Sequence, residues 1–210
     1  MALQSVWYYS NLPEDIINII EKDLKENFDS QFEISKLYEN TLNIDKRNSY
    51  NAWIPTTHWV AGFLWHYVQR ANRENFLYDL RNIDGESLQY TRYDAGQFYG
   101  WHNDAGLSSY YKPKCINALS SGSSDELATD FVNQNIELVR KLSFLLQLSD
   151  PDDYEGGNVQ FIDDTGNSYI APRKRGTIVL FDSRAQHRVL KVTKGHRKSI
   201  VGWVCGPRWK

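Results

Sequence analysis

Residues 93–104 read Tyr-Asp-Ala-Gly-Gln-Phe-Tyr-Gly-Trp-His-Asn-Asp, a stretch rich in aromatic residues that ends in His102-Asn103-Asp104. Alternate residues of a β-strand point to the same face of the sheet, so His102 and Asp104 can bind one metal ion together. The same short pattern also fits a surface histidine beside a turn aspartate. This stretch alone does not separate the two interpretations.

A second histidine favours the metal interpretation. His187 begins another predicted strand, 85 residues after His102. Two imidazoles and one carboxylate on a β scaffold are the ligand set of non-haem Fe(II) oxygenases, and this set leaves positions open for a co-substrate and dioxygen. The sequence therefore indicates a site formed by His102, Asp104 and His187.

The predicted strand 197–204 carries an arginine that needs a partner. By alternation Arg197, Ser199 and Trp203 share one face of this strand, and His196 points away from it. An arginine that points into a β barrel requires an anion, because burying an unpaired charge is costly. A bound carboxylate would meet this need through a two-point contact with Arg197, assisted by the hydroxyl of Ser199.

From residue 87 onward, short segments rich in Tyr, Val, Ile and Phe alternate with Gly, Asp or Pro. This pattern predicts an all-β sandwich or barrel, because βαβ units would require helices between the strands. The predicted strands are 87–93, 97–104, 138–148, 158–162, 168–171, 176–182, 187–192 and 197–204.

Helical signals are confined to the first part of the chain. Pro13 and the two acidic residues after it suit the first turn of a helix, and a second helix is expected from Thr56 or Thr57. The stretch 29–52 between them gives no clear pattern. The expected apolar faces comprise Ile16, Ile17, Ile19, Ile20 and Leu24 in the first helix and Val60, Phe63, Leu64, Tyr67 and Val68 in the second.

The composition excludes several classes of protein. The 210 residues are 41% hydrophobic and 14% aromatic, which is enough apolar material for a core and argues against a disordered chain. The net charge of −2 gives no basic excess, so binding to nucleic acid is not expected. Two cysteines, no signal peptide and no long apolar run predict a cytoplasmic protein without membrane contact.

The sequence resembles the prolyl 4-hydroxylase-like 2-oxoglutarate/Fe(II) oxygenases. Residues 93–104 match that family's Y-x-x-G-x-x-Y-x-x-H-x-D signature, and further matching segments follow in the same order as in the family. The size is similar to that of small bacterial or phage members. The further segments are 142–145, 154–157, 176–181, 187–189, 192–197 and Trp203.

The resemblance implies a mainly β protein with flanking helices, folded as a double-stranded β-helix (a cupin-like jelly roll). It implies His102, Asp104 and His187 as iron ligands and Arg197 as the partner of the distal carboxylate of 2-oxoglutarate. The co-substrate pocket would also include Ser199 and Tyr93. Tyr99 and Trp203 are expected either to line the substrate pocket or to pack in the core. The implied cofactors are Fe(II), 2-oxoglutarate and dioxygen, with ascorbate as a possible addition.

We expect one oxygenase domain over residues 1–210, with helical support in 1–85 and the jelly-roll core in 86–205. The expected reaction is hydroxylation of a prolyl residue in a peptide or protein, with succinate and carbon dioxide as co-products. The long segment 105–136 is expected to cover an extended substrate as a lid. The same chemistry on a free amino acid, another small metabolite or a nucleobase stays open, because the fold does not fix the substrate. A jelly-roll module without catalysis is not favoured, because no expected ligand is missing.

Overall fold

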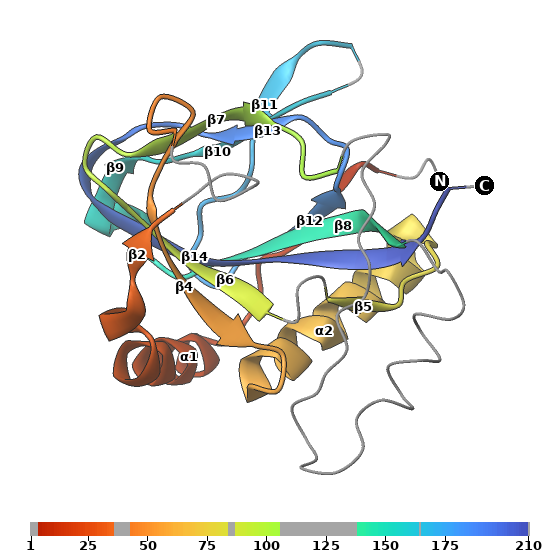
Figure 1. Cartoon of the computed structure of the whole chain (residues 1–210), viewed down its shortest axis with the longest axis horizontal. Coiled ribbons are helices and arrows are strands. Elements are labelled where there is room, and N and C mark those ends of the chain that lie inside the picture. Colours follow the sequence, from red (N-terminus) through yellow and green to blue (C-terminus); the bar gives the residue numbers. More distant parts are fainter. Residues whose placement is uncertain (1–3, 36–42, 84–86, 106–137, 164, 210) are drawn as a thin grey trace.

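Two antiparallel β-sheets face each other in the computed structural model, which describes residues 4–35, 43–83, 87–105, 138–163 and 165–209 (Figure 1). The major sheet has the strand order β1-β12-β8-β14-β6-β4-β2, with β5 and β9 also paired to β14. The minor sheet has the order β11-β10-β13-β7-β3. This arrangement confirms the predicted mainly β, double-stranded β-helix fold.

The major sheet consists of β1 (Val6–Tyr9), β2 (Glu33–Ile34), β4 (Tyr50–Pro55), β5 (Asn82–Ile83), β6 (Ser87–Asp94), β8 (Leu138–Gln147), β9 (Tyr154–Gly156), β12 (Ile178–Asp182) and β14 (Val192–Pro207). The minor sheet consists of β3 (Arg47–Asn48), β7 (Phe98–His102), β10 (Val159–Ile162), β11 (Ser168–Ile170) and β13 (His187–Val189). All eight predicted strands are present, with ends that differ by a few residues.

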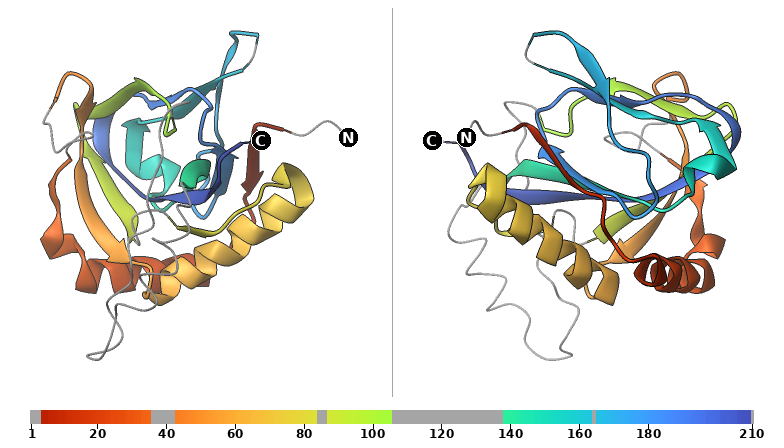
Figure 2. Two further views of the ribbon diagram at one scale, coloured as in Figure 1. Left: turned by 45° about the vertical axis from the view of Figure 1, so that its right-hand side comes forward. Right: turned by 180° about the vertical axis from the view of Figure 1, so that it is seen from behind.

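Two helices, α1 (Glu14–Asn27) and α2 (Trp59–Ala71), cover the outer face of the major sheet (Figure 2). The first begins where the sequence predicts, after Pro13, and the second begins at Trp59, two residues after Thr57. The predicted apolar faces pack against the core, with Ile16, Phe63 and Tyr67 partly buried, except that Ile19 is exposed. Short helical turns at Asp29–Gln31, Asn72–Phe76 and Pro151–Asp153 complete the helical elements of the described residues.

Alternation along β14 separates the two faces of the major sheet. Ile200 and Val204 belong to the apolar core beneath the helices. Arg197, Ser199 and Val201 point to the other face, toward the minor sheet, as the sequence predicts. His196 is exposed, which also agrees with the sequence prediction. The space between the two sheets therefore receives the polar side chains of the strand.

The expectation that the first part of the chain is helical support was incomplete. Strand β4 begins in the stretch 29–52 that gave no clear pattern, and it pairs with β6 over its whole length. Strand β1 pairs with β12 at the other edge of the major sheet. Strand β9 lies between the predicted strands 138–148 and 158–162, where no strand was expected. The division of the chain at residue 85 stays a prediction.

Two further predictions concern the lid and the absence of membrane contact. The expected lid, residues 105–136, lies outside the described residues except for Ala105. Within the described residues, no helix combines the length and the apolar character needed to cross a bilayer. The cytoplasmic location stays a prediction.

Candidate metal centre and co-substrate pocket

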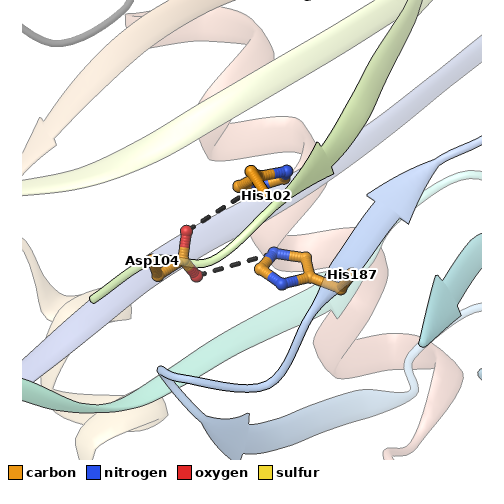
Figure 3. Close-up of side chains that lie close together, drawn as sticks. All are labelled: His102, Asp104 and His187. Atoms are coloured by element: carbon orange, nitrogen blue, oxygen red, sulfur yellow. Dashed lines mark ion pairs between the residues drawn. The ribbon is translucent and has the colours of Figure 1, made fainter. Parts of the chain in front are cut away.

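His102 and His187 lie opposite each other on neighbouring strands of the minor sheet. Their Cα atoms are register partners where β7 pairs with β13, so both imidazoles project from one face at the same level. Asp104 follows His102 by two residues, just beyond the end of β7. Figure 3 shows the three side chains pointing toward one another. Residues 85 positions apart in the sequence thus form one cluster.

The donor atoms of this cluster are spaced for a single ion. Nε2 of His102 is 3.7 Å from one carboxylate oxygen of Asp104, and Nε2 of His187 is 3.6 Å from the other. The three residues can place one ligand atom each within 4.8 Å of one another. An ion with bonds of about 2.0–2.2 Å bridges donors separated by about 3–4 Å. The geometry therefore fits one first-row metal ion.

Backbone carbonyls fix the tautomer of both imidazoles. Nδ1 of His102 lies 2.8 Å from the carbonyl oxygen of Gly100, and Nδ1 of His187 lies 3.0 Å from that of Ala185. A carbonyl oxygen only accepts, so each Nδ1 carries the proton and donates it. Each Nε2 then keeps its lone pair for a metal, which is the usual arrangement around metal-binding histidines.

The environment holds His102 and Asp104 in their metal-binding protonation states. Burial, together with the neighbouring His187, lowers the pKa of His102 to about 4. Burial raises the pKa of Asp104, but the two imidazoles and the Ser143 hydroxyl outweigh it, so this pKa lies below its usual range. At neutral pH His102 is therefore a neutral imidazole and Asp104 a carboxylate.

Aromatic rings surround the cluster and limit its contact with water. The ring of Tyr99 stacks on His102 with 3.6 Å between centroids. Phe161 and Phe181 pack around His187, at 5.7 and 4.7 Å between centroids. Burial raises the pKa of Tyr99 to about 12, so its hydroxyl stays protonated. Tyr99 therefore lines the cluster directly.

Arg197 is almost completely buried on the facing sheet, with 1% of its surface exposed. Its Nη2 donates to Oε1 of Gln147 at 2.7 Å, while its Nε has no hydrogen-bond partner within the described part of the chain. The same holds for the buried hydroxyl of Ser199. A pocket with a buried guanidinium and two unused polar atoms is suited to a carboxylate ligand, because buried polar groups are normally hydrogen-bonded.

Two neighbours shape the surroundings of Arg197. Tyr93 is its register partner on β6, and the Arg197 guanidinium lies 5.8 Å from the Tyr93 ring centroid. Gly157, with φ of +63°, comes so close that a Cβ there would lie 3.2 Å from Cδ of Arg197 and 2.9 Å from a methyl group of Val192. Glycine is therefore required both for the backbone conformation and for the space that the arginine occupies.

Trp203 lies farther along the same face of β14 and is half-buried, with the Arg140 guanidinium 4.3 Å from its ring centroid. Its indole Nε1 is buried and finds no hydrogen-bond partner among the residues that the structure describes. Arg140 also donates to the backbone carbonyl of Asp104 at 3.3 Å. Trp203 is thus linked to the metal cluster through Arg140, although it does not contact the three ligands.

The sequence reasoning missed several polar residues on these inner faces. Gln147 and Ser143 belong to the predicted strand 138–148, where they are the polar positions of the otherwise apolar run 142–148. That exception to the pattern was the available signal. Arg47 lies in the stretch without periodicity, and nothing in the sequence linked it to the site.

Comparison with known proteins identifies the family. Residues 88–205 match the model of the 2OG-Fe(II) oxygenase superfamily, which is more than half of the chain. The chain belongs to this superfamily. It is similar to a PKHD-type hydroxylase of Picosynechococcus sp., with 33% identity over 148 residues, 69% of this chain and 54% of the relative. The chain thus spans about half the length of that curated relative.

Solved structures with the same fold include a prolyl-4-hydroxylase of Pseudomonas putida, with a TM-score of 0.64, 17% identity, and coverage of 98% of this chain and 94% of that chain. A prolyl hydroxylase of Trichoplax adhaerens, in complex with a peptide fragment of the hypoxia inducible factor oxygen degradation domain, matches with a TM-score of 0.69 and 16% identity over 95% of this chain and 83% of that chain. At 16% and 17% identity, these two structural matches support the assignment of the fold and nothing beyond it.

The family match confirms the predicted enzyme class. The chain is a 2OG-Fe(II) oxygenase by family, and this family implies Fe(II), 2-oxoglutarate and dioxygen as cofactors. His102, Asp104 and His187 provide a donor set that fits the iron. The requirement for ascorbate stays a prediction.

Proposed function

We propose that the enzyme hydroxylates a prolyl residue in a peptide or protein, with succinate and carbon dioxide as co-products. One observation carries the proposal: two imidazoles and one carboxylate converge between the sheets, on the side that also receives the buried Arg197. The names of the similar proteins support a prolyl substrate, and one of those proteins was solved with a peptide.

The proposed iron ligands are Nε2 of His102, Nε2 of His187 and a carboxylate oxygen of Asp104. Iron with 2-oxoglutarate and dioxygen supplies the oxidation that couples decarboxylation of the co-substrate to hydroxylation of a C–H bond. The protein's part is to hold the ligands in one orientation. The carbonyls of Gly100 and Ala185 do so by accepting the Nδ1 protons.

Arg197, Ser199 and Tyr93 form the proposed co-substrate pocket. Nε of Arg197 and Oγ of Ser199 have no partner among the described residues and are available to bind the distal carboxylate of 2-oxoglutarate. Gln147 accepts a hydrogen bond from Nη2 of this guanidinium and so fixes its orientation. Charged hydrogen bonds of this kind contribute about 1.5–3 kcal/mol each, which is enough to orient a small dicarboxylate.

Tyr99 and Trp203 are proposed to line the substrate side of the site. Tyr99 covers one face of the His102 ring and keeps water from it. Trp203 offers a half-buried ring and a free indole N–H, an arrangement suited to an extended peptide that brings both apolar groups and carbonyl oxygens.

Mass spectrometry of a library of proline-containing peptides tests the proposal. The library is incubated with the enzyme, Fe(II), 2-oxoglutarate and air, and a matched sample omits 2-oxoglutarate. We expect a gain of one oxygen on proline only in the complete mixture. Production of succinate without any modified peptide would contradict the prolyl substrate, leave the dioxygenase chemistry intact and move the search to small molecules.

A further inference from the structure

Arg47 is a second buried arginine between the sheets, with 7% of its surface exposed. Its Nε donates to the hydroxyl of Ser49 at 3.2 Å, and its Nη2 donates to Oδ1 of Asn51 at 3.1 Å. Among the described residues Arg47 has no carboxylate partner, and its Nη1 makes no hydrogen bond. Burial of a cation against neutral partners alone is unfavourable, so an anionic ligand would stabilise this side chain.

The position of Arg47 brings it next to the metal cluster. Where β3 pairs with β7, Arg47 is the register partner of Tyr99. Its guanidinium carbon lies 4.8 Å from the centroid of the Tyr99 ring, and that ring stacks on His102 at 3.6 Å. A ligand that reaches Arg47 is therefore one aromatic ring away from a proposed iron ligand.

A polar row on the inner face of the major sheet connects Arg47 with Arg197. Asn51 on β4, Thr91 on β6, Ser199 on β14 and Gln147 on β8 are successive register partners, and all four are buried. Arg47 donates to the amide at one end of this row, and Arg197 donates to the amide at the other end. The two arginines thus have equivalent surroundings at opposite sides of one site.

The proposed site supplies no negative charge that is left for Arg47. The two positive charges of Fe(II) and the one of Arg197 match those of Asp104 and of the two carboxylates of 2-oxoglutarate. Arg140 near Asp104 adds a further positive charge, and Arg47 has no carboxylate partner among the described residues. A substrate carboxylate would give Arg47 this partner in a region where water, and so screening, is limited.

We propose that Arg47 binds a carboxylate of the substrate and makes the enzyme selective for anionic substrates. The inference rests on the proposed function, because it concerns the substrate of the same site. The carboxylate has two possible sources, which are an acidic side chain near the proline of a peptide and the α-carboxylate of a small amino acid. Because the guanidinium is planar and held by Ser49 and Asn51, it can offer a fixed two-point contact to either.

The test measures binding to the protein loaded with Mn(II) and 2-oxoglutarate, a state chosen to prevent turnover. The first set of probes is blocked proline peptides that differ only in having Asp, Asn or Lys at one position beside the proline. The second set is free L-proline and L-prolinamide. Titration calorimetry gives the affinities for the wild type, for Arg47→Gln and for Arg47→Lys. Each carboxylate probe has an uncharged partner of nearly the same shape.

We expect about 10- to 100-fold tighter binding of the Asp peptides than of the Asn peptides in the wild type, as a charged hydrogen bond predicts. Arg47→Gln should remove this difference by weakening only the Asp peptides, and Arg47→Lys should retain part of it. A difference between L-proline and L-prolinamide, without one among the peptides, would identify the α-carboxylate as the source. Equal binding of acid and amide probes in the wild type would overturn the inference.

Arg92→Gln is the matched control, since it removes the same charge from β6, a strand of the facing major sheet. Arg92 forms an ion pair with Asp94 and lies beside Phe32 and Tyr50, away from the inner face. It should leave the preference for acid probes unchanged, whereas an equal loss in both variants would contradict a local role of Arg47. Circular dichroism shows whether Arg47→Gln folds. If it does not, the affinities of the acid and amide probes for the wild type and for Arg47→Lys still test whether Arg47 binds a carboxylate.

Failure of the inference and failure of the proposed function give different results. Oxygen gain on proline with Fe(II), measured on the same probes, reports on the proposed function. Hydroxylation of Asp and Asn peptides with equal efficiency would support a prolyl hydroxylase and reject selectivity through Arg47. Tight, Arg47-dependent binding of acid probes without any oxygen gain would support the carboxylate site and reject proline as the target.

Discussion

The two faces of the major sheet are built by the same strands and have opposite chemistry. On the outer face Phe144, Ile200 and Val204 pack beneath α1 and α2 in a continuous apolar cluster. On the inner face the alternate residues of these strands include Gln147, Arg197 and Ser199, all of them buried. Helix burial thus stabilises the sheet from one side, so the other side is free to hold polar groups whose hydrogen bonds are incomplete.

This division predicts that substitutions on the two faces have separable effects. A change on the outer face should lower the free energy of unfolding and leave the ligand set in place. A change on the inner face, or in the facing minor sheet, should impair metal or co-substrate binding with a smaller effect on folding. Four substitutions test the division.

His187→Ala should have the largest effect, because it removes one of three proposed iron ligands. We expect no detectable iron-dependent formation of succinate, and much weaker metal binding in a calorimetric titration. Far-UV circular dichroism should remain like that of the wild type. Full activity in this variant would exclude His187 as a ligand.

Phe144→Ala tests the outer face. Phe144 is fully buried, and its ring is so close to Gly202 that a Cβ at position 202 would lie 2.3 Å from the Phe144 Cζ. Loss of this ring should lower the free energy of unfolding by about 3–5 kcal/mol, as measured by urea denaturation. Under native conditions the affinity for 2-oxoglutarate should stay within about twofold of the wild type. A selective loss of co-substrate affinity in a stable protein would break the division between the faces.

Arg197→Ala tests the inner face of the same sheet. Removal of the guanidinium should raise the 2-oxoglutarate concentration required for half-maximal succinate formation at least about tenfold, because a charged contact contributes about 1.5–3 kcal/mol. Loss of the buried charge should not have a comparable effect on iron binding. An unchanged requirement for 2-oxoglutarate would remove Arg197 from the pocket.

His196→Ala should have the smallest effect. His196 is adjacent to Arg197 in the sequence but is exposed. We expect a change in the free energy of unfolding within about 0.5 kcal/mol and no change in the 2-oxoglutarate requirement. A large effect on either quantity would mean that sequence proximity, and not the face of the sheet, determines the role of a residue here.

The sequence predicted those features that depend on local pattern. The alternation in β7 and β14 placed His102, Asp104 and Arg197 correctly, because a period of two is set by the strand itself. His187 was predicted from its place at the start of a strand, and the family resemblance then specified the all-β fold as a double-stranded β-helix. The apolar spacing of α1 was also a local pattern, with the period of a helix, and was clear from the sequence. Ile19 fits this spacing but is exposed.

Features that depend on pairing over long distances could not be predicted. Strand β3 has only two residues, and only its register with β7 brings Arg47 to Tyr99. The polar row from Asn51 to Gln147 crosses four strands that are far apart in the sequence. Strand β3 carries no periodic signal of its own, and the patterns of β6, β8 and β14 do not reveal which strands pair or in which register.

The central claim is that His102, Asp104 and His187 hold one metal ion whose co-substrate reaches Arg197. A crystal structure of the protein grown with Mn(II) and 2-oxoglutarate tests it most directly, with anomalous scattering to locate the metal. We predict a single manganese bonded to Nε2 of both histidines and to Asp104, and a carboxylate of 2-oxoglutarate hydrogen-bonded to Arg197 and Ser199. A metal bound elsewhere, or a co-substrate whose carboxylate does not contact Arg197, would contradict the account.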